Sequence, residues 1–356
     1  MLVLAIETSC DDTCAAVLAG EAGTVTLLSN LVSSQLIHEE YEGIVPELAS
    51  REHLRLIGPV VSRVLEQAGV DLPALDAVAV TSGPGLIGSL LVGLSLGKAL
   101  AYGLGIPVIG INHIEGHLAA AALEFGADRA RPPFVGLVAS GGHTEIMLVS
   151  EWGRWSLLGA TRDDAAGEAF DKVAKLLGMG FPGGAAISKA ARAGNPEAYA
   201  FPRAWLDLDG GGLDLSFSGL KTSVKLFLDE QDWPERPADP VQRARFVADV
   251  AASFEEAVVD VLSRKLWKAV EKAGASRVVV AGGVAANRAL RQRLVEGAAE
   301  RGLELEIPSP PLCGDNAAMI GMAALQRLQR GECSSYDLAA IPNLDDWTGH
   351  YQQTAP

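Results

Sequence analysis

The 356-residue chain is poor in cysteine, in histidine and in basic residues. Its four cysteines, Cys10, Cys14, Cys313 and Cys333, are too few for a disulfide framework and favour a reducing compartment. Lysine and arginine number 29 against 44 aspartates and glutamates, which gives a net charge of −15. That balance argues against broad, nonspecific nucleic-acid binding, although it leaves room for a local basic groove.

A targeting segment is also missing from the sequence. The first residues, MLVLAIETSCDD, have no basic start, and their apolar run is shorter than the roughly 7–15 residues of a signal core. The apolar stretch from Gly85 to Ile111 contains Lys98 and Pro107 and divides into a helix and a strand. We therefore interpret it as buried core and expect a cytoplasmic protein.

Two apolar hairpins with polar, glycine-bearing tips are present. LVLAIETS, a turn at Cys10–Thr13 and CAAVLA predict strand–turn–strand, and residues 134–150 repeat the pattern. Strands that alternate with helices follow each hairpin, which predicts parallel sheets in an α/β fold. The expected domains are a first lobe of residues 1–128, a second lobe of residues 129–330, and a tail of residues 331–356 that packs on the first lobe.

Two of the six histidines stand four residues apart in NHIEGHLAAA. At about 3.6 residues per turn, His113 and His117 would lie on one face of a helix and could bind one common atom. Two buried imidazoles satisfied by backbone carbonyls would explain the pair as well as metal binding does. A third ligand would decide between these alternatives.

Asp315, in PLCGDNAAM, is the residue that would complete a metal site. It stands where a glycine turn meets the start of a helix, so its alternative role is an N-cap, worth about 1 kcal/mol. Two imidazoles and one carboxylate with open coordination positions form a facial metal site. Because Asp315 lies far from the histidines in the sequence, only the fold can bring the three together.

Two glycine turns that follow predicted strands suit phosphate binding. In SGGHTE, residues 140–145, paired glycines let backbone N–H groups approach an anion, although Gly-Gly also favours a plain hairpin turn. In AGGVAANRALR, residues 281–291, a Gly-Gly pair precedes a helix N-terminus, and Asn287 offers a donor and an acceptor. The chain lacks GxGxxG and the P-loop lysine, so neither a Rossmann dehydrogenase nor a P-loop ATPase is indicated.

Acidic residues gather in two further segments. RDDAAGEAFDKVAKLLG predicts an amphipathic helix with Asp164, Glu168 and Asp171 on one stripe, which is either a solvated acidic face or part of a site. The FPGG turn that follows favours a role for Asp171. Asp11 and Asp12, on the first hairpin tip, either hold a metal-bound water, orient a nucleophile or form the turn.

Eight motifs, in matching order, resemble the TsaD family, the tRNA N6-adenosine threonylcarbamoyltransferases: AIETSCDDT, NHIEGHLAA, SGGHTE, DDAAGEAFDKVAKLLG, FPGG, LSFSGLKT, AGGVAAN and CGDNAAM. The resemblance runs from residue 1 to about residue 330. It implies an actin-like, sugar-kinase-like ATPase fold, with two lobes of duplicated topology and the site in a central cleft. It also implies transfer of a threonylcarbamoyl group from threonylcarbamoyl-adenylate to the exocyclic N6 amine of the adenosine 3′ of the anticodon, in tRNAs that read ANN codons.

The resemblance also assigns roles to residues. It implies that His113, His117 and Asp315 bind one divalent metal ion, Fe(II) first, with zinc or magnesium as alternatives. It implies that the adenylate is held by Val138, Ala139, Ser140, Gly141, Gly142, Asp171, Gly184, Ser188 and Asn287. Three positions depart from the family's pattern: Phe181 stands where tyrosine is common, Ala185 where proline is common, and Ser188 where some relatives carry aspartate.

The mechanism that this reaction requires follows from its donor. A mixed anhydride is already activated, so the enzyme must mainly position two substrates and stabilise charge. A metal ion would polarise the carbonyl, and the amides of Ser140–Gly142 would donate to phosphate oxygens. We expect Asp11 to assist the loss of a proton from the adenosine amine.

An acidic chain needs a local source of positive charge to bind tRNA, because phosphate contacts dominate nucleic-acid affinity. Three clusters offer it, and each also fits a solvated helix face: Arg51 and Arg55; Arg264, Lys265 and Lys268; Arg288, Arg291 and Arg293. We expect tRNA to dock on a localised patch with the help of partner proteins. The resemblance implies a smaller paralogous actin-fold subunit and a P-loop ATPase in a bacterium, and no membrane.

Three other functions compete with this interpretation. An ATP-dependent small-molecule kinase of the same fold would use the hairpin tips but has no need of the histidine pair. A zinc metallopeptidase requires HExxH, whereas Ile114 holds the place of the glutamate and Glu115 would point to another side of the helix. A non-catalytic scaffold paralogue has no reason to keep all three expected ligands.

Overall fold

The computed structural model describes residues 1–343 apart from 22–23, 42, 181, 207–211 and 236. Contacts within the chain divide it into two compact units, and each is described by itself. Unit 1 comprises Met1–Pro132, Glu151–Arg154 and the chain from Gly314 onward, and unit 2 comprises Pro133–Ser150 and Trp155–Cys313. Phe181 lies outside the described residues.

The second predicted boundary is wrong, whereas the first lies within a few residues of the observed one. We expected the second lobe to extend to residue 330, but the chain returns to unit 1 at Gly314. The reason is packing: helix α10 (Ala317–Leu328) lies against strands of the first sheet and against helix α3 (His113–Phe125). Residues 331–343 also pack on unit 1, where Ser334 N donates to Val108 O over 2.8 Å and Ile341 N donates to Ser82 O over 2.7 Å.

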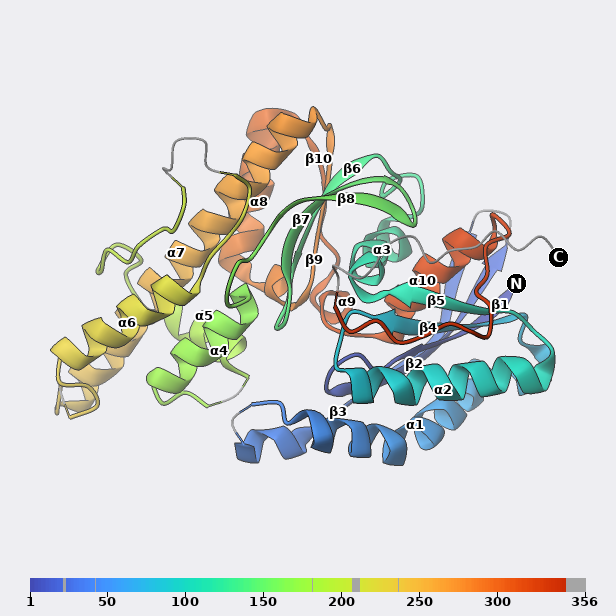
Figure 1. Ribbon diagram of the computed structural model, residues 1–356. Helices are drawn as coiled ribbons and strands as arrows, with labels where there is room; N and C mark the ends of the chain where they lie inside the picture. Colours follow the sequence, from blue (N-terminus) through green and yellow to red (C-terminus); the bar gives the residue numbers. More distant parts are fainter. Residues whose placement is uncertain (22–23, 42, 181, 207–211, 236, 344–356) are drawn as a thin grey trace. The chain divides into compact units, whose positions relative to one another are not determined.

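Each unit is built on a five-stranded mixed sheet, and the two sheets have the same strand order (Figure 1). In unit 1 the order is β3 (Thr24–Ser34), β2 (Asp12–Glu21), β1 (Leu2–Glu7), β4 (Ala77–Gly83) and β5 (Val108–Asn112). In unit 2 it is β8 (Arg154–Ala160), β7 (Thr144–Glu151), β6 (Phe134–Ala139), β9 (Arg277–Ala281) and β10 (Glu304–Glu306). In unit 1, β1 pairs antiparallel with β2 and parallel with β4. In unit 2, β6 pairs in the same way with β7 and β9. The predicted duplicated topology is confirmed.

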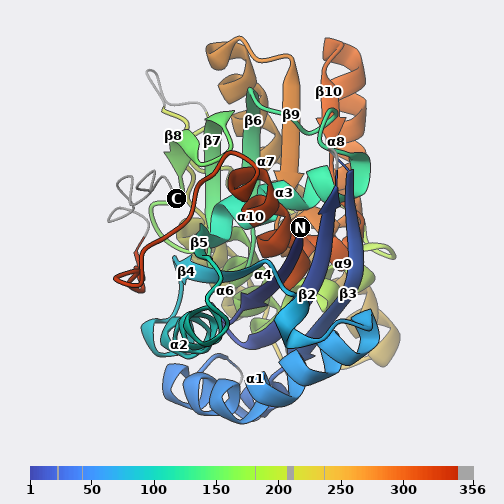
Figure 2. The ribbon, with the colours of Figure 1, turned by 90° about the vertical axis from the view of Figure 1, so that its right-hand side faces the viewer.

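Helices cover both faces of the unit 1 sheet (Figures 1 and 2). Helices α1 (Pro46–Ala68) and α2 (Ile87–Leu104) pack on one face, and α3 and α10 pack together on the other. Close approach on that second face depends on small residues. A β-carbon on Gly321 of α10 would lie 2.2 Å from a Leu18 methyl, and one on Gly116 of α3 would lie 2.6 Å from an Ile320 methyl. Short 3-10 turns lie at Leu36–Tyr41 and Leu72–Ala74.

The apolar stretch at Gly85–Ile111 divides as expected, into α2 and β5. The strand is buried throughout, but only one face of the helix is buried, and Leu91 and Tyr102 are exposed. By length and composition alone, α2 is long and apolar enough to cross a membrane, with 33% of that window buried inside the protein. Among the described residues it is the one helix that passes this test, which is weak evidence for a span.

Unit 2 carries its helices around a larger apolar core. They are α4 (Ala166–Leu176), α5 (Gly183–Ala191), α6 (Ser218–Glu230), α7 (Pro240–Ala273), α8 (Arg288–Arg301) and α9 (Pro310–Cys313), with a 3-10 turn η3 at Gly283–Ala286. The 34-residue α7 supplies much of that core and contacts α5 and α8. The predicted helix at 162–178 is shorter than expected, since α4 begins at Ala166.

Candidate functional site

The histidine pair stands at the start of α3, directly after β5. The Asn112 side chain caps this helix by accepting from Ile114 N over 2.8 Å and from Glu115 N over 3.2 Å. The cap sets the first turn, so His113 and His117 point to the same side, with ring centroids 4.6 Å apart. Both imidazoles are buried, at 3% and 0% exposure. The prediction that they share one helical face is confirmed.

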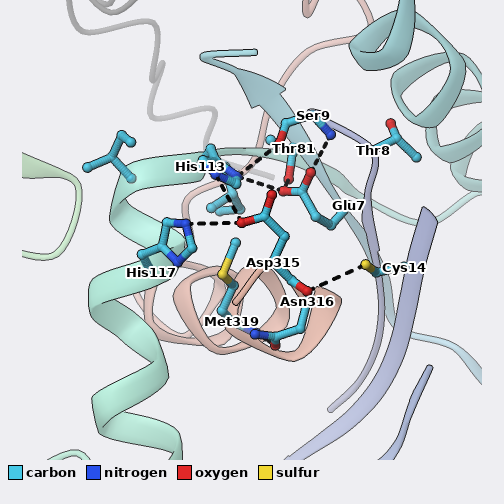
Figure 3. Close-up of polar contacts among 12 residues, drawn as sticks. Glu7, Thr8, Ser9, Cys14, Thr81, His113, His117, Asp315, Asn316 and Met319 are labelled. Carbon is cyan, nitrogen blue, oxygen red and sulfur yellow. Dashed lines mark hydrogen bonds and ion pairs between the residues drawn. The ribbon is translucent and has the colours of Figure 1, made fainter. Parts of the chain in front are cut away.

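Asp315 does not cap α10. Asn316 does, because its side chain accepts from Met319 N over 3.0 Å. The Asp315 carboxylate instead faces the imidazoles, with Oδ1 3.6 Å from His113 Nε2 and 3.2 Å from His117 Nε2 (Figure 3). One ligand atom from each of the three residues lies within 4.8 Å of the others. The expected convergence of the three side chains is therefore present within unit 1.

The chemistry of these three groups fits a divalent metal ion. Metal–ligand bonds of about 2.0–2.2 Å place neighbouring donor atoms roughly 3–3.5 Å apart, close to the two distances from Asp315 Oδ1. Among the described residues, neither ring nitrogen of the buried His117 has a hydrogen bond of good geometry. Burial lowers the pKa of His117 and so keeps the imidazole neutral, the form that binds metals. A cation here would bind Nε2 of His117 together with the Asp315 carboxylate, which lies 3.2 Å from that nitrogen.

A second carboxylate, on Glu7 at the end of β1, contacts the other ring nitrogen of His113, Nδ1 (Figure 3). Glu7 Oε2 lies 3.0 Å from His113 Nδ1 and accepts from Thr81 Oγ1 over 2.6 Å, while Ser9 N donates to Oε1. Burial raises the pKa of Glu7, but the charge and hydrogen bond of His113 oppose it, and the pKa is lowered overall. An ionised Glu7 holds the Nδ1–H proton and leaves Nε2 facing Asp315. Glu7 was not among the residues predicted from the sequence, although a glutamate inside a buried strand is a signal that could have identified it.

The first hairpin tip carries Asp11 and Asp12, both half-buried. Asp11 O accepts from Gln35 N over 3.2 Å, so its backbone forms part of the turn. Asp12 begins β2, and burial raises its pKa to about 7, with smaller contributions from Asp315 and Asp11. Its Oδ1 atom is buried and has no hydrogen-bond partner among the described residues. The role expected for Asp11 as a proton acceptor stays a prediction.

The second hairpin tip, Val138–Gly142, closes at the end of β6. Ser140 N donates to His143 O over 2.8 Å, and Ser140 Oγ accepts from His143 N over 3.2 Å. Gly141 and Gly142 are exposed, open space lies beside their α-carbons, and no backbone N–H of either makes a hydrogen bond within the described chain. A hairpin turn and two available amide donors are thus present together.

The second hairpin tip packs against the glycine turn at Gly282–Gly283. Gly167, in the first turn of α4, donates to Ser140 O over 3.1 Å. Gly282 follows β9 with φ of 91°, and a β-carbon there would lie 2.3 Å from Ala139 O, so only glycine fits. The carboxyl ends of β6 and β9 and the start of α4 therefore lie together, as expected for parallel strands.

The remaining expected adenylate contacts lie in the same unit and hold its turns in place. Asp171 Oδ1 accepts from Gly183 N over 2.7 Å, which joins α4 to the start of α5, where Gly184 also lies. Asn287 caps α8 through Leu290 N and donates to Glu255 Oε1 over 2.6 Å.

Ser188 hydrogen-bonds the same carboxylate, that of Glu255 in α7. Glu255 was not among the residues predicted from the sequence. Burial raises the pKa of Glu255, and the hydrogen bonds from Asn287 and Ser188 oppose the shift. This glutamate therefore orients both side chains.

The acidic stripe predicted for α4 is wrong. Asp164 precedes the helix, so helical spacing does not place it in a stripe with Glu168 and Asp171. Its carboxylate instead lies 2.8 Å from Lys172 Nζ and 2.8 Å from Lys221 Nζ. The sequence pattern misled because the chain turns at residues 162–165 before the helix begins.

Known proteins match nearly the whole length of this chain. A family profile described as "TsaD: tRNA N6-adenosine threonylcarbamoyltransferase" matches residues 26–322. A protein of that name from Clostridium perfringens (strain SM101 / Type A) is 47% identical over 344 residues, covering 96% of this chain and 97% of the relative. Another from Geobacter sp. (strain M21) is 49% identical over 343 residues, covering 96% of each chain.

Solved structures of lower identity are similar in fold. Full-length HypF in a phosphate- and nucleotide-bound form aligns with a TM-score of 0.59 at 15% identity, covering 93% of this chain and 47% of that one. Component A of (R)-2-hydroxyglutaryl-CoA dehydratase from Acidaminococcus fermentans aligns with a TM-score of 0.50 at 15% identity, covering 92% and 96%. The expected actin-like ATPase fold is confirmed. With nearly its whole length matched at almost half identity, this chain belongs to the family of tRNA N6-adenosine threonylcarbamoyltransferases.

Proposed function

We propose that this chain transfers a threonylcarbamoyl group from threonylcarbamoyl-adenylate to the N6 amine of the adenosine 3′ of the anticodon, in tRNAs that read ANN codons. The observation that carries the proposal is family membership over 96% of the chain. The convergence of His113, His117 and Asp315, which the motifs anticipated, supports it. No observation in the described structure favours a kinase or a peptidase, and Glu115 pairs with Arg327 instead of the histidines.

His113, His117 and Asp315 would hold one divalent ion, and two imidazoles with one carboxylate suit Fe(II) or zinc better than magnesium. When bound, such an ion supplies Lewis-acid polarisation and offsets phosphate charge. Glu7 fixes the ring of His113 and keeps its Nε2 lone pair available. Glu7 acts through His113, because its carboxylate contacts Nδ1 of the ring and not the nitrogen that would bind the ion.

Unit 2 would bind the adenylate portion of the donor, threonylcarbamoyl-adenylate. The exposed Gly141 and Gly142 amides, next to Ser140, would donate to phosphate oxygens as charge develops on them during transfer. Val138 and Ala139 form the strand end beneath them. Asp171, Gly184, Ser188 and Asn287 would contact the nucleoside portion, with Glu255 orienting the last two.

The adenosine amine is a weak nucleophile and must lose a proton as it attacks. Asp11 would accept that proton, and the half-buried Asp12 beside it is the other carboxylate of this tip. Asp11→Ala tests the assignment, with Asp12→Asn as its matched control. Near-normal transfer by Asp11→Ala with intact donor binding would end it.

A cytoplasmic location and two protein partners complete the proposal. The partners are a smaller paralogous actin-fold subunit and a P-loop ATPase, and their help suits an acidic chain that must bind tRNA. None of the four cysteines forms a disulfide within the described structure, which agrees with a reducing compartment.

The decisive experiment is mass analysis of tRNA nucleosides after incubation with threonylcarbamoyl-adenylate. The expected product is threonylcarbamoyladenosine, formed by wild type and not by a His113→Ala/His117→Ala double variant. Reactions without tRNA, with and without ATP, control for a kinase. Transfer of phosphate to a small molecule, with no modified adenosine, would refute the proposal.

A further inference from the structure

Helix α1 of unit 1, which the structure describes in full, carries one polar residue among its buried residues. This residue is His53, which is 0% exposed. It shares a stripe with Ala49 and Ile57, four residues before and after it, and the helix packs on β2 and β3. A buried polar ring needs hydrogen-bond partners, so the partners of His53 indicate what it holds in place.

Both ring nitrogens of His53 contact the first hairpin tip, Cys10–Thr13. Nε2 lies 2.9 Å from Cys10 O, and Nδ1 lies 2.8 Å from Thr13 Oγ1. Because a carbonyl oxygen can only accept, Nε2 carries the proton, and Nδ1 accepts from the Thr13 hydroxyl. Burial lowers the pKa of His53 and keeps the ring neutral, although the bond to Cys10 O opposes the shift. One neutral imidazole thus holds both residues that flank Asp11 and Asp12.

The first turn of α1 holds the middle of the same tip through Gln35. Gln35 N donates to Asp11 O over 3.2 Å, and the side-chain Nε2 of Gln35 donates to Ala49 O over 3.2 Å. His38 Nε2 lies 3.0 Å from Gln35 Oε1 and so fixes the orientation of the amide. Gln35 and His38 are both buried. Three of the four tip residues are therefore tied to α1, directly or through one side chain.

The chain just before the tip contacts the candidate metal centre. Ser9 Oγ lies 3.1 Å from His113 Nδ1, and Glu7 Oε2 lies 3.0 Å from the same nitrogen (Figure 3). The segment from Glu7 to Thr13 is thus fixed at one end to a proposed metal ligand and at the other end to His53. The two carboxylates of the tip lie between these fixed points.

We infer that His53 is a positioning residue for the transfer reaction: by holding Cys10 and Thr13, it fixes where the carboxylate of Asp11 lies. The inference rests on the proposed function, because it requires Asp11 to accept the proton of the adenosine amine. Proton transfer needs an acceptor within hydrogen-bond reach, and a displacement of about 1 Å can cost roughly 100-fold in rate. The imidazole itself exchanges no proton with the substrate and acts through Asp11.

The test compares single-turnover transfer by His53→Leu and His53→Gln in the full chain, at saturating donor and tRNA. Leucine fills a similar volume but offers no hydrogen bond, whereas glutamine offers one donor and one acceptor, like the neutral imidazole. We expect His53→Leu to transfer roughly 10- to 100-fold more slowly than wild type and His53→Gln to recover most of that loss. Affinity for AMP and metal content should match wild type. A loss of metal would place the effect at His113 and overturn the inference.

Ser29→Ala is the matched control. Ser29 Oγ donates to Val64 O over 2.7 Å, so this variant removes another buried hydrogen bond of α1, near the end of the helix remote from His53. Its thermal midpoint should fall while its transfer rate stays at the wild-type value. Thr13→Val removes only the hydroxyl that donates to His53, and it should slow transfer less than His53→Leu does. If His53→Leu does not fold, Thr13→Val decides alone, and a wild-type rate would overturn the inference.

A second substitution, Asp11→Ala, gives a result that a merely structural role would not produce. If His53 acts through Asp11, His53→Leu/Asp11→Ala transfers no more slowly than Asp11→Ala alone. Losses that multiply would mean that His53 only supports the fold, and they would overturn the inference, as would wild-type transfer by His53→Leu. Near-normal transfer by Asp11→Ala would remove both the proton acceptor and this role of His53 while the function stands. Wild type that makes no modified adenosine would refute the function itself.

Discussion

Replacing Glu7 by glutamine should weaken metal binding without removing any proposed ligand. The Glu7 carboxylate accepts from Thr81 Oγ1 over 2.6 Å and lies 3.0 Å from His113 Nδ1, and it also accepts from Ser9 N. A glutamine of the same shape keeps one acceptor oxygen but turns an amide donor toward a pocket occupied by donors. Either the His113 hydrogen bond is lost, or the ring moves its proton to Nε2 and can no longer bind metal through that atom.

The size of the effect follows from hydrogen-bond energetics. A hydrogen bond to a charged group contributes about 1.5–3 kcal/mol and a neutral one about 0.5–1.5 kcal/mol, so the exchange costs roughly 1–2 kcal/mol. That corresponds to about a 5- to 30-fold weaker affinity, which overlaps the lower part of the roughly 10- to 100-fold range typical of groups that orient metal ligands. Thr81→Val, which removes one bond to Glu7 but keeps its charge, should have a smaller effect.

The assay is competition between metal-free protein and a chelator of known affinity. Nitrogen NMR of the His113 ring provides a second readout, because it reports which ring nitrogen is protonated, and a merely structural role would leave the tautomer unchanged. A Glu7→Gln protein with wild-type metal affinity and a wild-type tautomer would refute the reasoning.

Three further predictions concern the ligands, a buried ion pair and pH. The His113→Ala/His117→Ala double variant should lose its bound metal by elemental analysis, and unchanged stoichiometry would falsify the metal assignment. Arg327→Met should lower the free energy of unfolding by about 3–5 kcal/mol in denaturant titrations, because the 0% exposed guanidinium lies 2.7 Å from Glu332 and 3.5 Å from Glu115. Glu332 would keep its ion pair with Arg330, but the buried Glu115 would lose its ion pair. Arg330→Met, at a half-exposed position, should cost less than about 1 kcal/mol, and equal losses would contradict the argument. Because the pKa of Asp12 is raised from 3.8 to about 7, the folded state holds its proton more tightly, and stability should fall as pH rises from about 4 to 7, by at most about 4 kcal/mol. Asp12→Asn should remove that slope in metal-free protein, and an identical pH profile for both proteins would show that Asp12 is not buried as described.

Local periodicity carried most of the fold prediction. The hairpins at β1–β2 and β6–β7 and the helix with its histidine pair were identified from spacing alone, since each depends on neighbours within a few residues. Boundaries were less certain: α4 begins four residues later than the pattern suggested, which moved Asp164 out of its stripe.

Residues of the candidate site could be predicted only where they lie in a recognisable sequence motif. Asp315 could be proposed as a ligand, but the same position suited an N-cap, and the choice fell to Asn316 because that side chain reaches Met319 N. The position of Glu7 in an apolar strand could have marked it as a buried carboxylate, but its contact with His113 could not be predicted, since nothing in β1 indicates that its end faces α3.

The sequence by itself determined the alternating strands and helices, the shared face of His113 and His117, the turn glycines and the family. Tertiary structure decided that the chain returns to unit 1 at Gly314, so that Asp315 meets the histidines, that Glu7 lies behind His113, and that His53 of α1 holds the first hairpin tip. The physical reason is the distance along the chain over which each kind of interaction acts. Backbone geometry and side-chain period act over a few residues, whereas contacts between distant segments depend on how all the buried surfaces pack together.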